Sequence, residues 1–142
     1  MLVREFLRKA PVTVPPQCTL EEAARLMGQH AVGAVLVISG DELVGIVTDR
    51  DIAVRGVGAG RPSTTSVSDV MTGRLVTIEG SADVFEAYRV LKGAGIRRLP
   101  VLEAGELGGI VTVDDLLVAL VLELAAVVSP VASELLQPDI SE

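Results

Sequence analysis

The strongest constraint on the fold is an internal duplication. Residues 3–53 align with residues 67–117 at a constant offset of 64 positions without a gap, and 14 of the 51 aligned positions are identical. A repeat of this size usually cannot bury its own apolar face and packs against its neighbour. We therefore predict two similar halves related by a pseudo-two-fold axis, with two equivalent clefts between them. That arrangement favours ligand binding over catalysis.

The hydrophobic pattern predicts the same βαββα order in each half, so the fold class is α+β. In the first half we expect a short helical lead at 3–7, strands at 12–14, 35–38 and 43–47, a helix capped by Thr19 and a last helix from Thr48. In the second half we expect a lead at 67–71, strands at 76–78, 99–102 and 107–111, a helix capped by Asp83 and a last helix from Thr112. Residues 1–60 and 61–130 are the predicted repeats of one compact tandem domain, joined by a linker at 57–66, and residues 131–142 form a C-terminal tail.

Composition narrows the class of protein further. Apolar residues make up 49% of the chain but aromatic residues only 2%, so the core must consist of aliphatic side chains. The net charge of -7 argues against nucleic-acid binding, which needs clustered basic residues. A single cysteine rules out an internal disulfide, and a cytoplasmic location is the simplest expectation.

The longest apolar run is too short to span a membrane. It extends from Leu116 to Val128 and is interrupted by Glu123. We predict a buried helix here, followed by a short helix at 132–136 between Pro130 and Pro138. No signal or transit peptide is recognisable at the start.

The duplicated motif Gly-apolar-apolar-Thr-x-x-Asp lies where a strand is predicted to become a helix. It has two interpretations. Thr48 and Asp51 match a capping box, in which each side chain bonds the other residue's backbone amide. The same helix start also presents free amides and a partial positive charge, so the carboxylate can bind ribose hydroxyls. In either case Gly45 and Gly109 allow a ligand or a neighbouring backbone to approach closely.

No catalytic constellation is visible. With one histidine and one cysteine, neither a Ser-His-Asp triad nor a Cys-His pair has support. No glycine-rich phosphate loop is present. Asp114 and Asp115 are more typical of carboxylates at a helix start than of a metal site. We predict a protein that is not an enzyme and has no metal site or cofactor.

Three sets of residues together resemble the cystathionine-β-synthase (CBS) domain family. They are Asp69 to Thr72, Gly95 to Val101, and the two Gly-Ile-Val-Thr-x-x-Asp segments. The resemblance covers residues 3–120 and is that of one tandem CBS pair. It implies two sheets packed face to face about a pseudo-dyad. It also implies two clefts that bind adenosine-type ligands such as AMP, ADP, ATP or S-adenosylmethionine.

The resemblance also implies that each cleft draws on both repeats. The residues that it assigns to cleft A are Thr48, Asp49, Arg50 and Asp51 from the first repeat, with Thr72, Val76, Arg97 and Arg98 from the second. Those that it assigns to cleft B are Thr112, Val113, Asp114 and Asp115 from the second repeat, with Arg8, Val12, Gly33 and Ala34 from the first.

The two clefts differ where a phosphate would lie. Arg97 and Arg98 of the second repeat align with Gly33 and Ala34 of the first, and Arg50 aligns with Asp114. Arginine–phosphate bonds are charge-assisted and often bidentate. We therefore predict that cleft A binds a phosphorylated adenosine. Cleft B should be empty or bind an uncharged or cationic derivative. The alternative is that the two arginines pair with surface acids.

The leading hypothesis is a regulatory module that senses an adenosine nucleotide and signals to an effector protein that the sequence does not identify. One alternative is a structural homodimerisation module with vestigial clefts, and another is a binder of S-adenosylmethionine or adenosine. We expect a homodimer in each case, because the run from Leu116 to Val128 is apolar on almost all sides.

Overall fold

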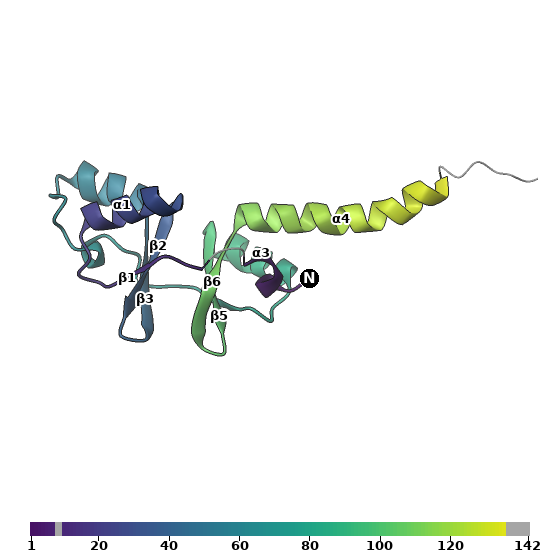
Figure 1. The fold of residues 1–142 in the computed structure, drawn as a ribbon, viewed down its shortest axis with the longest axis horizontal. Coiled ribbons are helices and arrows are strands. Elements are labelled where there is room, and N and C mark those ends of the chain that lie inside the picture. The colour runs from purple at the N-terminus through teal and green to yellow at the C-terminus, as the bar shows by residue number, and fades with distance from the viewer. Residues whose placement is uncertain (8–9, 136–142) are drawn as a thin grey trace, which may run out of the picture.

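The structure, a computed structural model, describes residues 1–7 and 10–135 (Figure 1). Both halves have the predicted βαββα order. The first half contains η1 (Val3–Phe6), β1 (Thr13–Val14), α1 (Leu20–His30), β2 (Ala34–Ser39), β3 (Glu42–Thr48), α2 (Asp49–Asp51), η2 (Ile52–Gly56) and η3 (Val57–Ala59). The second contains η4 (Val67–Asp69), β4 (Ile78–Glu79), α3 (Val84–Ala94), β5 (Arg98–Glu103), β6 (Glu106–Thr112) and α4 (Val113–Leu135).

Each half forms a three-stranded mixed sheet, in the orders β1-β2-β3 and β4-β5-β6. The first strand pairs parallel with the second, and the second and third form an antiparallel hairpin. The hairpins preserve the 64-residue offset in detail. Ala34 faces Thr48 as Arg98 faces Thr112, and both registers shift just after the central valine, Val37 or Val101.

The short helical lead of each half packs into the core of the other half. Val3 and Phe6 of η1 are buried in the core of the second half, whereas Val67 and Val70 are buried in the core of the first. Backbone bonds attach each lead there, from the Val3 amide to the Ala82 carbonyl at 2.9 Å and from the Val67 amide to the Cys18 carbonyl at 2.7 Å. Figure 1 shows the N-terminal segment beginning beside α3 and crossing to β1. The two halves are therefore interlocked.

A third apolar cluster joins the two sheets. Buried Ala34, Leu36 and Ile46 of the first sheet pack with Leu107 and Ile110 of the second. This contact is the face-to-face packing that the resemblance implied. It brings the starts of β2 and β5 together beside the pseudo-dyad and leaves a cleft on either side.

Cys18 lies between β1 and α1 and belongs to the core of the first half. Its side chain is 6% exposed. Burial, together with the nearby Glu22 carboxylate, raises the pKa of its thiol to about 11.

The prediction of a buried helix between Leu116 and Val128 is wrong. Leu116 and Ala119 are buried, but beyond them α4 projects away from the rest of the molecule (Figure 1). The helix also continues through Pro130 to Leu135, where the sequence suggested a boundary and a separate short helix. A proline in a helix forfeits one backbone hydrogen bond, which solvent can replace on an exposed helix. Over the described residues, no helix is long and apolar enough to cross a membrane.

Candidate ligand-binding site

Cleft A lies at the junction of the two repeats and has a volume of about 230 Å³. The structure brings six of its predicted residues together around this cleft. They are Thr48 and Asp51 from the end of β3 and the first turn of α2, with Thr72, Val76, Arg97 and Arg98 from the second repeat. The remaining lining residues include Arg74 and Ile96. The lining therefore combines one carboxylate and two threonine side chains with three arginines.

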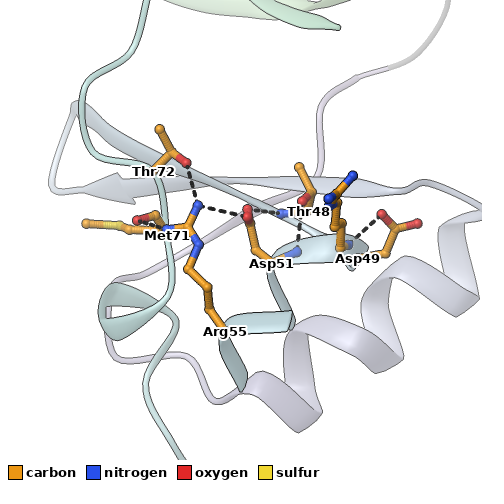
Figure 2. Close-up of polar contacts among 7 residues, drawn as sticks. Thr48, Asp49, Asp51, Arg55, Met71 and Thr72 are labelled. Carbon is orange, nitrogen blue, oxygen red and sulfur yellow. Dashed lines mark hydrogen bonds and ion pairs between the residues drawn. The ribbon is translucent and has the colours of Figure 1, made fainter. Parts of the chain in front are cut away.

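Thr48 and Asp51 form the capping box that their spacing predicted (Figure 2). The Thr48 amide donates to Asp51 Oδ2 at 2.9 Å, and the Asp51 amide donates to Thr48 Oγ1 at 3.1 Å. Thr112 and Asp115 repeat these bonds at 2.9 and 3.2 Å. The box holds each carboxylate in a defined orientation at the mouth of its cleft. The structural and the ligand-binding interpretations of the motif are thus compatible.

Arg55, which the sequence reasoning did not single out, bonds two residues that line cleft A. Its Nη2 lies 3.0 Å from Asp51 Oδ1 and 3.3 Å from Thr72 Oγ1, and its Nη1 lies 3.5 Å from the Met71 carbonyl oxygen (Figure 2). It therefore connects the Asp51 carboxylate to the lead of the other repeat. The i,i+4 spacing of Asp51 and Arg55 was the available signal. Ala119 stands at the equivalent position in the second repeat.

Gly45 lets the lead of the second repeat approach β3. The Ile46 amide donates to the Thr72 carbonyl at 3.1 Å, and the Thr72 amide donates back to the Ile46 carbonyl at 3.0 Å. A Cβ on Gly45 would collide with Met71 Sδ and lie 3.2 Å from the Thr72 carbonyl oxygen. The close approach anticipated for this glycine is therefore made by a neighbouring backbone. It sets Thr72 beside Thr48 and Asp51.

Asp49 and Arg50 do not line cleft A, although both were predicted there. Both are exposed at the start of α2, and the Asp49 carboxylate accepts a bond from the Arg50 amide at 2.8 Å. Arg74 supplies a third guanidinium in place of Arg50. The duplication gave no hint of this role for Arg74, because the aligned residue in the first repeat, Ala10, carries no charge.

Cleft B lies across the pseudo-dyad and has a volume of about 350 Å³. Its predicted residues Val12, Gly33, Ala34, Thr112 and Asp115 all line it. Val113 and Asp114 instead border a small adjacent depression together with Arg97 and Arg98, and the predicted Arg8 lies outside the described residues.

The prediction that Arg98 belongs to cleft A alone is wrong. Arg98 lines cleft B as well as cleft A. The reason is steric. Gly33, at the position equivalent to Arg97, has no side chain, so the Arg98 guanidinium extends over it. Within residues 1–7 and 10–135, no group of three His, Cys, Asp or Glu side chains is placed to hold a metal ion.

Comparison with known proteins agrees with this geometry. YhcV of Bacillus subtilis, a CBS domain-containing protein, is 40% identical over 116 residues, which are 82% of this chain and 83% of YhcV. The structure of PAE2072 from Pyrobaculum aerophilum, complexed with AMP, superposes with a TM-score of 0.79 at 26% identity, covering 89% of this chain and 99% of the other. The CBS domain pair of MJ0100, in complex with 5′-methylthioadenosine and S-adenosyl-L-methionine, gives 0.73 at 26% identity, covering 81% and 91%.

The profile of the CBS domain family matches this chain twice, at residues 3–57 and 67–122. The two matches coincide with the duplicated halves and include the Thr48–Asp51 and Thr112–Asp115 motifs. The chain therefore belongs to the CBS domain family, as a tandem pair of CBS repeats.

Proposed function

We propose that this protein is a regulatory module that binds an adenosine nucleotide of the AMP, ADP or ATP type in cleft A and relays its occupancy to a partner protein. The observation that carries the proposal is the composition of cleft A. Its lining includes the fixed carboxylate of Asp51, the hydroxyl-bearing side chains of Thr48 and Thr72, and three arginines, Arg74, Arg97 and Arg98. A carboxylate suits ribose hydroxyls, and guanidinium groups suit a phosphate.

Two further observations support this assignment. The similar protein PAE2072 is complexed with AMP in its solved structure, and the pair from MJ0100 is in complex with two adenosine derivatives. In addition, cleft A is built from both repeats, so a ligand there would stiffen their junction and alter the surface offered to a partner. We propose regulation and not catalysis, since among the described residues that line the two clefts no nucleophile is paired with a base.

The direct test is thermal unfolding and calorimetry with AMP, ADP, ATP, adenosine and S-adenosylmethionine. A ligand at a hundred times its Kd should stabilise the fold by about 2.7 kcal/mol. Replacing Asp51→Ala removes a capping interaction, which costs about 0.5–2 kcal/mol with or without ligand. It should also abolish the nucleotide-induced stabilisation at cleft A.

The matched control is Asp115→Ala, which removes the same capping interaction at cleft B. It should lose the capping contribution alone, because Ala119 stands where Arg55 bonds Asp51 in the first repeat, and it should keep nucleotide binding at cleft A. If neither wild type nor control responds to any of these ligands, the sensing function is wrong. The second candidate, a structural dimerisation module with vestigial clefts, would then be favoured by the exposed apolar surface of α4.

A further inference from the structure

Arg98 lies where the two clefts meet. It is the first residue of β5, beside Thr112 in the sheet register, and its counterpart Ala34 is buried at the contact between the sheets. Arg98 lines cleft A, cleft B and the small depression at the start of α4. One arginine thus borders both candidate ligand sites.

The position of its guanidinium depends on Gly33. A Cβ on Gly33 would lie 2.8 Å from Arg98 Nη2 and 3.2 Å from Asp49 Oδ2. The Arg98 side chain therefore crosses from the second repeat to the surface of the first. It occupies space that any other residue at position 33 would fill. The structure places its charge between the clefts rather than in one of them.

The rest of the charge is distributed unequally. Cleft A has Arg74 and Arg97 in addition to Arg98. Among the described residues that line cleft B, Arg98 is the only cation, and the carboxylate of Asp115 opposes it. The sequence predicted no anion in cleft B, but Arg98 provides a contact for one there; such an anion depends on Arg98 alone, whereas an anion in cleft A has two other arginines.

Building on the proposed nucleotide site, we propose that Arg98 is a shared anion contact that couples the clefts, so that an anionic ligand in one weakens anionic ligand binding in the other. A guanidinium directed to a phosphate in cleft A withdraws from cleft B, and the two phosphates repel each other. Coupling of this kind is reciprocal, so each ligand weakens the other by the same factor. An uncharged ligand such as adenosine should show no such coupling.

Calorimetry with AMP tests this coupling on the full chain. Asp115→Asn impairs cleft B, so this variant gives the association constant of cleft A alone. Asp51→Asn impairs cleft A and gives the association constant of cleft B alone. Asparagine keeps an oxygen that accepts the capping bond. The product of the two association constants in wild type should fall below the product of the single-cleft constants by about five- to hundredfold.

In an Arg98→Ala background cleft B should no longer bind AMP measurably, and the association constant of cleft A should be the same with and without Asp115→Asn. The exposed Arg89→Ala on α3 is the matched control and should retain the full coupling. Gly33→Ala provides an independent test of the coupling, because the added Cβ should displace the Arg98 guanidinium toward cleft A. It should weaken AMP binding in cleft B and spare cleft A.

The possible failures are distinguishable. The coupling would be overturned if the product of the two association constants in wild type equalled the product of the single-cleft constants. It would also be overturned if Gly33→Ala bound AMP in both clefts as wild type does. Either result would leave the proposed function intact. The absence of AMP binding to cleft B in Asp51→Asn would also overturn the coupling. If wild type binds no AMP, ADP or ATP in either cleft, the proposed function itself fails.

Discussion

At the scale of single residues, Gly45 and Gly109 control how closely each lead approaches the opposite sheet. Met71 and Thr72 lie against Gly45, and Leu7 Cδ2 lies 3.0 Å from the place that a Cβ on Gly109 would occupy. The backbone bonds between Ile46 and Thr72 require this approach. Both glycines therefore shape the clefts without needing to contact a ligand.

Replacing Gly45→Ala should destabilise the protein by about 1–3 kcal/mol, because the added Cβ collides with Met71 and crowds the Thr72 carbonyl. It should also weaken any nucleotide binding by displacing Thr72. Chemical denaturation measures the first effect and calorimetry the second. Gly28→Ala is the control, since nothing lies within 4 Å of its Cβ and alanine favours a helix. Equal stability of the two variants would contradict this role.

At the scale of elements, the last helices of the two repeats begin alike and then diverge. Both follow a Thr-x-x-Asp capping box, but the first repeat passes through a π-helical turn at Ile52–Gly56 and ends its helical course at Ala59. Glycines at 56, 58 and 60 align with leucines at 120, 122 and 124. Leucine favours a helix by comparison with glycine, so α4 continues. Its exposed apolar residues are Leu117, Val118, Val121, Leu122, Leu124, Val127, Val128 and Val131.

We expect this surface of α4 to be buried in a homodimer, because isolated proteins rarely expose so continuous an apolar face. Light scattering coupled to gel filtration should give the mass of a dimer. Leu124 is 63% exposed, so Leu124→Glu should shift the population toward monomer without loss of folded structure. Ser63→Glu adds the same charge at an exposed linker position and should remain dimeric. A monomeric wild type would refute the expectation.

At the scale of the whole molecule, the exchanged leads make the two halves one cooperative unit. Val3 and Phe6 complete the core of the second half, and Val67 and Val70 complete that of the first. The third cluster then joins the two sheets. A ligand between the repeats therefore acts on two halves that cannot fold independently without losing core residues.

Replacing Phe6→Ala should cost about 3–5 kcal/mol and lower the unfolding temperature of the whole molecule in one transition. The reason is that its 6% exposed ring fills the core of the other half. Differential scanning calorimetry separates one transition from two. Val57→Ala, at a side chain that is 75% exposed, should change stability by less than about 0.5 kcal/mol. Two resolved transitions would show that the halves unfold separately.

Several features of this protein follow from the sequence alone because they are local or periodic. The hydrophobic pattern, which the duplication repeats, predicted the βαββα order of each half. The Thr48-x-x-Asp51 spacing predicted the capping box, which needs only neighbouring residues. The resemblance to CBS domains then assigned residues from both repeats to cleft A.

Other features depend on contacts between distant segments, which neither spacing nor periodicity encodes. The exchange of the leads, the bonds from Arg55 to Thr72 and the place of Arg74 in cleft A emerge only when the repeats are packed. The same holds for Arg98, which borders both clefts and whose guanidinium lies over Gly33, where no side chain fills the space. Local sequence thus determined the order of helices and strands and the capping box in each half. Tertiary packing decided which charged side chains line the two clefts.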